Sequence, residues 1–137
     1  MTDIEARYEH GDRFRVVIRD HELLVDQPLT DGGEDAGPTP TELFVAGLAT
    51  CVGFYTERFL RRHGLPSEGL AVRCGYTFAD DRPARVGRIH IQVLLPEGFP
   101  EARRAALIAV VEHCTVHNSI ATAPEIAIEL GAASLAA

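Results

Sequence analysis

The chain has 137 residues and a formal net charge of -7, and its 13 basic residues are all arginines. This length predicts one domain, residues 1–137, that can bury a hydrophobic core. The acidic balance argues against nucleic acid or an anionic membrane as a partner, because phosphate groups bind basic surfaces. Without lysine the chain can form neither a Schiff base nor a P-loop.

The start of the chain and its cysteines bear on the compartment. The segment MTDIEARYEHGDRF is charged and lacks the apolar stretch of a secretory signal peptide. No uninterrupted apolar run approaches the ~20 residues that cross a bilayer. Together with three cysteines, an odd number, this predicts a reducing cytoplasm. We expect any disulfide there to be transient and catalytic.

Three short extended segments open the chain. The predicted strands are Ile4–His10, Phe14–Arg19 and Glu22–Asp26, with turns at Gly11-Asp12 and Asp20-His21. Apolar residues of the second strand alternate with arginines, which predicts one buried and one wet face. The Gly- and Asp-rich segment from Pro28 to Pro38 has no periodicity and is expected to be a loop.

Strong start and stop signals frame a long helix. Thr39 is the predicted N-cap, Pro40 occupies the first helical position, and Glu42 completes a capping box. The helix is expected to run to about residue 63, because Gly64 supplies a left-handed residue and Pro66 prevents continuation.

The first half of this helix is unusually apolar. No charged residue occurs between Glu42 and Glu57, and Cys51 lies in the middle of that run. A helix that is apolar on every side is expected to be enclosed on every side. A single chain of 137 residues is too small to cover both this helix and the three N-terminal strands. The pattern therefore favours dimerisation, with paired central helices and sheets shared between chains.

The rest of the chain predicts a hairpin, a second helix and a last strand. Leu70, Val72, Cys74, Tyr76 and Phe78 share one face, as do Ile89, Ile91, Val93 and Leu95, with a hairpin loop from Asp80 to Gly87. A helix beginning near Pro100 carries Leu107, Val110, Val111 and Cys114 along one stripe, and Glu125–Leu130 points Ile126, Ile128 and Leu130 inward. The order βββ-α-ββ-α-β is typical of an α+β fold.

The three cysteines allow different interpretations. Cys74 lies on the inward face of a strand and is expected to be a small buried core residue. Cys51 and Cys114 are either two core cysteines that never meet or a pair in which one thiolate attacks and the other closes a disulfide. His113, Cys114 and His117 form a short cluster, but structural zinc needs four ligands at defined spacing, so no metal site is expected.

Two segments carry a resemblance to a known family. GGEDAGPTPTELFVAGLATC, followed by a long helix and later by EHCTVHNSI, closely resembles the OsmC/Ohr family of thiol peroxidases and, more narrowly, its broad OsmC-like clade. The resemblance implies an OsmC-like fold in an intertwined homodimer, with two central helices flanked by mixed sheets. It also implies organic hydroperoxides as substrates, an external dithiol such as a lipoylated protein as reductant, and no metal or organic cofactor.

The same resemblance assigns roles to particular residues. Cys51 matches the family's peroxidatic cysteine and Cys114 its resolving cysteine. Its activating glutamate and arginine are matched by Glu42 and, among the arginines of the N-terminal strands (Arg13, Arg15 and Arg19), by Arg13. Glu42 is nine residues from Cys51, ~13 Å along a straight helix and on the opposite side, so it caps its own helix or acts on a neighbouring protomer. In the organic-hydroperoxide members the glutamate lies one residue earlier, where this chain has Thr41.

These observations lead to a main hypothesis and an alternative. The main hypothesis is a cytoplasmic, dimeric peroxidase in which a Cys51 sulfenate is resolved as a disulfide with Cys114. We expect the substrate site to have apolar walls, which would favour an alkyl or lipid-like peroxide. The residues expected to form these walls are Leu43, Phe44, Leu48, Phe54 and Tyr55. The alternative is an OsmC-like protein that binds a small hydrophobic or sulfur-containing ligand without peroxide turnover.

Overall fold

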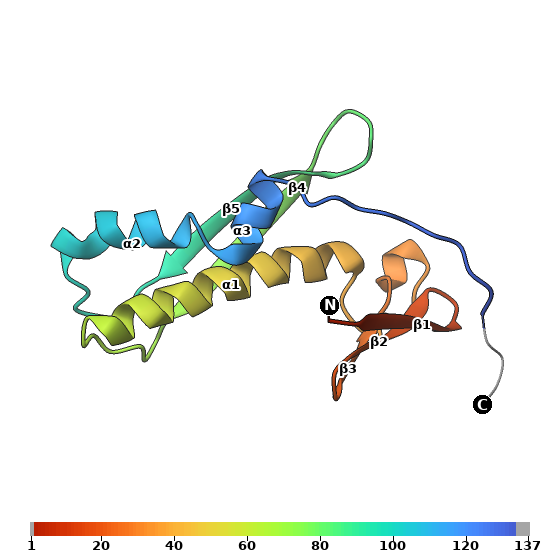
Figure 1. Cartoon of the computed structure of the whole chain (residues 1–137), viewed down its shortest axis with the longest axis horizontal. Coiled ribbons are helices and arrows are strands. Elements are labelled where there is room, and N and C mark those ends of the chain that lie inside the picture. The colour runs from red at the N-terminus through yellow and green to blue at the C-terminus, as the bar shows by residue number, and fades with distance from the viewer. Residues whose placement is uncertain (1, 134–137) are drawn as a thin grey trace.

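The computed structural model describes residues 2–133 and contains two antiparallel sheets, one long helix and two shorter helices (Figure 1). The strands and helices are β1 (Ile4–His10), β2 (Arg13–Ile18), β3 (His21–Val25), η1 (Leu29–Asp31), α1 (Pro40–Arg62), β4 (Ala71–Phe78), β5 (Val86–Leu94), η2 (Glu101–Arg103), α2 (Arg104–Val111) and α3 (Thr115–Ala121). The N-terminal strands pair in the order β1-β2-β3, and β4 pairs with β5. This architecture confirms the predicted α+β class.

The ends of α1 are set by local sequence. Thr39 Oγ1 accepts a hydrogen bond from the Glu42 backbone N–H at 3.1 Å, and Glu42 Oε1 accepts one from the Thr39 N–H at 2.9 Å. This capping box satisfies N–H groups that the first turn leaves without partners. At the other end, Gly64 adopts a left-handed φ of 65°, and the Leu65 N–H donates to the Leu60 carbonyl at 2.9 Å. The helix therefore ends at the left-handed Gly64, as expected from the sequence.

α1 also organises the core. The β4–β5 hairpin packs along it, as do α2 and α3 (Figure 1). Its buried residues are Val45, Leu48, Val52, Thr56, Phe59 and Leu60. Several of these form one cluster with Leu107, Val111 and Cys114, which follow in the second half of the chain. Because full burial of a large apolar side chain contributes ~1.5–3 kcal/mol, this cluster is a main source of stability.

Within one chain, α1 is not enclosed on every side. Phe44 is 44% exposed and Phe54 is 54% exposed, so part of the apolar surface of the helix has no cover. Among the described residues, α1 is the one helix whose length and composition would let it cross a membrane. Core helices pass the same test, and α1 packs against both the hairpin and the two shorter helices.

The last predicted strand is not formed in the single chain. Residues 125–130 belong to no sheet, and Ile126, Ile128 and Leu130 are 77%, 85% and 99% exposed. A strand needs a neighbouring strand whose backbone groups complete its hydrogen bonds. Since the described sheets consist of β1-β2-β3 and β4-β5 only, no sheet of the same chain pairs with this segment.

The second predicted helix is broken into two. α2 ends at Val111 and α3 begins at Thr115, and Cys114 between them is extended, with φ -65° and ψ 154°. Cys114 acts as the N-cap of α3, because its sulfur accepts a hydrogen bond from the His117 backbone N–H. The prediction of one helix that contains both Leu107 and Cys114 is therefore wrong, because the helix that holds Leu107 ends at Val111.

One buried carboxylate organises the loop that leads into α1. Asp26 is 1% exposed, and its side chain accepts hydrogen bonds from the backbone N–H groups of Gln27, Glu34 and Ala36 at 2.7–3.2 Å. The Ala36 N–H lowers the pKa of Asp26 most; burial raises it, and the net effect of all neighbours is a lowered pKa. This carboxylate fixes the loop that places Thr39 at the start of α1.

The loop carboxylate gives a testable pH dependence. Because folding lowers the pKa of Asp26, its contribution to stability is complete above the ordinary aspartate range, near ~4, and is lost as pH falls through the lowered pKa. Asp26→Asn places an amide N–H against backbone N–H groups, so we expect a lower Tm at neutral pH and a flatter fall of Tm toward acid pH. Asp31→Asn, at an exposed position of the same loop, is the matched control. Equal Tm values for the two variants at every pH would contradict this role.

Candidate active site

Two free thiols meet where α1 contacts the break between α2 and α3. Cys51 comes from the middle of α1 and is half-buried, whereas Cys114 caps α3 and is fully buried, at 0% exposed. Cys51 packs against the core cluster that contains Cys114, and its thiol is close enough to raise the pKa of Cys114. The structure therefore brings together the two cysteines that the resemblance pairs.

Backbone N–H groups at the start of α3 point at both sulfurs. Val116 donates its N–H to Cys51 Sγ at 3.5 Å, and His117 donates its N–H to Cys114 Sγ at 3.4 Å. The start of α3 is therefore bonded both to the sulfur on α1 and to the sulfur of its own N-cap. The residue types in TVHNSI give no sign of these donors, because they belong to the backbone.

The two thiols differ in how deeply they are buried. Burial raises the pKa of Cys114, and the neighbouring Cys51 thiol adds to the rise, while the His117 N–H opposes it. Cys114 is therefore protonated at neutral pH and shielded from solvent. A small molecule reaches the half-buried Cys51 first.

Two open hollows lie along α1, one lined by helix residues before Cys51 and one by helix residues after it. The first, of about 350 Å³, includes Phe44 and Leu48 on α1 with His117 and Ile120 on α3. The second, also about 350 Å³, includes Tyr55 and lies between α1 and α2. The remaining residues of the second hollow are Phe54, Arg58, Phe59, Arg62, His63 and Val110. Of the expected apolar walls, all but Leu43 line one of these two hollows.

The expected activating residues lie elsewhere in the single chain. Arg13 Nε donates to Glu9 Oε1 at 2.9 Å, and Arg15 donates to both Glu9 and Glu22. These ion pairs belong to the N-terminal sheet, which lies near the N-terminal end of α1 (Figure 1), whereas Cys51 lies in the middle of that helix. Glu42 is engaged in its own helix cap. One chain alone therefore does not bring the predicted arginine and glutamate to Cys51.

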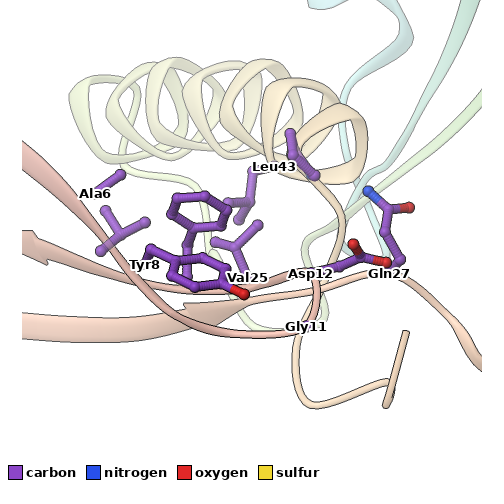
Figure 2. Close-up of a pocket in the computed structure, with 10 residues that line it drawn as sticks. Ala6, Tyr8, Gly11, Asp12, Val25, Gln27 and Leu43 are labelled. Carbon is purple, nitrogen blue, oxygen red and sulfur yellow. The ribbon is translucent and has the colours of Figure 1, made fainter. Parts of the chain in front are cut away.

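A larger hollow lies between the N-terminal sheet and the first turn of α1. Its volume is about 730 Å³, and Figure 2 shows Tyr8 and Val25 of the sheet facing Leu43 of α1. Tyr8 is 63% exposed and Phe14 is 39% exposed on the same surface. This hollow is an apolar face without cover in the single chain, and it is separate from the thiol pair.

The third cysteine lies outside the site, and His63 is bonded to the backbone of its own helix. Cys74 pairs with Ile91 across the β4–β5 hairpin, and burial raises its pKa. His63 Nδ1 lies 2.8 Å from the Phe59 carbonyl at the end of α1. Within residues 2–133, no three His, Cys, Asp or Glu side chains are placed to hold a metal ion.

Comparison with known proteins identifies the family. The model of the family described as OsmC-like protein matches residues 32–129, a span that contains both thiols. The chain belongs to the OsmC-like family. No curated protein sequence matches it.

Solved structures share the OsmC-like fold. One, from Psychrobacter arcticus 273-4, provisionally named an osmotic stress induced and detoxification response protein, has 21% identity and a TM-score of 0.78 over 87% of this chain and 88% of the other. An organic hydroperoxide resistance protein OsmC from Legionella pneumophila has 21% identity and a TM-score of 0.67 over 89% and 90%. The organic hydroperoxide resistance protein OhrB of Bacillus subtilis has 17% identity and a TM-score of 0.65 over 90% and 92%. At these identities the likeness establishes the fold.

Proposed function

We propose that this chain is a thiol-dependent peroxidase that reduces organic hydroperoxides in the cytoplasm. The observation that carries the proposal is the pair of thiols, one half-buried and one fully buried, each accepting a backbone N–H from the start of α3. Two structurally similar proteins are named for organic hydroperoxide resistance, which supports the same chemistry here.

The proposed reaction runs in three balanced steps. The Cys51 thiolate attacks the outer oxygen of the hydroperoxide, the O–O bond breaks, and the alkoxide takes a proton and leaves as an alcohol. Cys51 is then a sulfenic acid. The Cys114 thiol attacks its sulfur, and water leaves as the disulfide forms. An external dithiol gives up two electrons and two protons and restores both thiols.

The buried thiol suits the second step. Because its pKa is raised and it has no exposed surface, Cys114 is a poor competitor for peroxide. It lies beside Cys51, however, so a sulfenic acid formed there meets it without diffusion. The open hollow that contains Phe44 and Leu48 gives an alkyl group an apolar surface that begins one helical turn before Cys51 on α1.

We further propose that the protein works as a homodimer. The exposed apolar surface of one chain includes Phe44 and Phe54 on α1, the hollow beside the N-terminal sheet, and the C-terminal segment from residue 125 to 130. A second copy would cover these surfaces and offer a sheet edge to the C-terminal segment. The second copy would also carry its own Arg13 and Glu42, and these side chains would activate Cys51 across the dimer interface.

A second candidate is an OsmC-like binding protein without peroxide turnover. The observation that favours it is the placement of the expected activating groups: within one chain Arg13 is paired with Glu9, and Glu42 caps α1. Thr41 also stands where the resemblance places a glutamate. A small hydrophobic ligand would then occupy one of the two hollows along α1.

Counting free thiols separates the two candidates. The reduced protein is treated with one equivalent of cumene hydroperoxide per chain, and free thiols are titrated before and after. A peroxidase loses two of its three thiols per chain and recovers them with a dithiol. A protein that only binds the molecule keeps all three, and that result would overturn the proposed function.

A further inference from the structure

A hydrogen bond anchors the start of α3 next to the thiols. Tyr55 lies one turn after Cys51 on the same face of α1, and its hydroxyl is 2.9 Å from Thr115 Oγ1. The next residue, Val116, donates its N–H to Cys51 Sγ, and the preceding residue is Cys114. Cys114, Thr115 and Val116 are therefore consecutive. They carry, in that order, the second thiol, the hydroxyl bonded to Tyr55 and the N–H that Cys51 accepts.

Few other interactions fix the position of α3. The helix has only seven residues and no fully buried side chain, and the non-helical residues 112–114 separate it from α2. A helix this short does not persist without tertiary contacts. Its seat on α1 depends on the buried Cys114, on Val116, which packs against the core cluster, and on the bond between Tyr55 and Thr115.

We propose that Tyr55 is a positioning residue of the thiol site. Its hydroxyl, through Thr115, holds the start of α3 so that the Val116 N–H faces the Cys51 sulfur and Cys114 stays within reach. Loss of this bond lets the start of α3 move away from α1, which separates the sulfurs and removes the N–H from Cys51. The proposal rests on the proposed use of the two thiols as a reacting pair, and it does not depend on the oxidant.

The test therefore measures disulfide closure with an oxidant other than peroxide. Diamide accepts two electrons and two protons as the Cys51 and Cys114 thiols form an S–S bond, and the loss of thiols gives the closure rate. Tyr55→Phe and Thr115→Val are each expected to slow closure by ~3- to 10-fold, the effect of one neutral hydrogen bond. Thr115→Ser keeps the hydroxyl and is expected to close at nearly the wild-type rate.

A double variant distinguishes one shared bond from two separate effects. If Tyr55 acts through Thr115, Tyr55→Phe combined with Thr115→Val closes no more slowly than the slower single variant. Tyr76→Phe is the matched control, because Tyr76 lies on β4 opposite Ile89 and takes no part in the bond between Tyr55 and Thr115. Wild-type closure by Tyr55→Phe, slow closure by Thr115→Ser, or additive effects in the double variant would each overturn the proposal.

The same set of proteins separates this proposal from the peroxidase activity. If cumene hydroperoxide oxidises no thiol but diamide closure follows the expected pattern, Tyr55 positions the pair and the proposed function is wrong. If peroxide oxidises two thiols but Tyr55→Phe closes with diamide at the wild-type rate, the peroxidase stands and Tyr55 has no positioning role. A Tyr55→Phe protein with a lower Tm and unchanged closure likewise contradicts the proposal.

Discussion

Cys51→Ser is expected to reduce the consumption of cumene hydroperoxide to the rate of the buffer with dithiol alone. A serine hydroxyl stays protonated at neutral pH and is a far weaker nucleophile than a thiolate. Its oxygen can still accept the Val116 N–H that Cys51 Sγ accepts at 3.5 Å, so the fold around the site is retained. Peroxide loss is followed with excess substrate and a dithiol reductant at neutral pH.

The other cysteines provide the control for this variant. Cys74→Ser changes a thiol on β4 that belongs to neither helix of the site, and we expect it to consume peroxide at the wild-type rate. A Cys51→Ser protein as fast as wild type would show that Cys51 is not the nucleophile. Equal loss in Cys51→Ser and Cys74→Ser would point to general damage to the fold.

Cys114→Ser is expected to stop the reaction after the first step. Cys51 still reacts with one equivalent of peroxide, but its sulfenic acid has no second thiol to attack it and is oxidised further to sulfinic acid by excess peroxide. Serine is among the best N-cap residues, so its hydroxyl can replace the sulfur that accepts the His117 N–H at the start of α3. The variant therefore tests resolution without removing the cap.

Mass spectrometry of the intact protein gives the measurement. We expect Cys114→Ser to gain one oxygen after one equivalent of peroxide and a second oxygen in excess, whereas wild type loses two hydrogens and gains no oxygen. If Cys114→Ser turned over as fast as wild type with the same dithiol, the external reductant would resolve the sulfenate directly, and Cys114 would have no resolving role.

Much of the fold was predictable because its signals are local. Thr39, Pro40 and Glu42 determine the start of α1 by hydrogen bonds within four residues, and Gly64 determines its end. The alternation of Val72 with its neighbours on β4, and the matching alternation on β5, predicted a hairpin with one buried face. These elements need no knowledge of the rest of the chain.

The errors occurred where a side chain replaces a backbone hydrogen bond and where a strand has no sheet edge to join. A helical stripe through Leu107 and Cys114 predicted one helix, but the Cys114 sulfur caps a new helix, and this competition for the His117 N–H is not visible in a pattern of apolar residues. Ile126 and Ile128 alternate as in a strand, yet a strand forms only where a sheet edge is available.

The site was predictable in part. A resemblance paired Cys51 with Cys114, and the structure brings these thiols together. The backbone donors and the bond between Tyr55 and Thr115 were missed; the only signal was the four-residue spacing of Cys51 and Tyr55, which puts them on one helix face. Arg13 stays a prediction, since its role depends on a partner chain.

The most direct measurement is the identity of the disulfide that peroxide produces. The reduced protein is treated with one equivalent of cumene hydroperoxide, alkylated, digested without reductant and mapped by mass spectrometry. We predict a single Cys51–Cys114 linkage within one chain, with Cys74 alkylated. A linkage that includes Cys74, or three alkylated cysteines after peroxide treatment, would contradict the account.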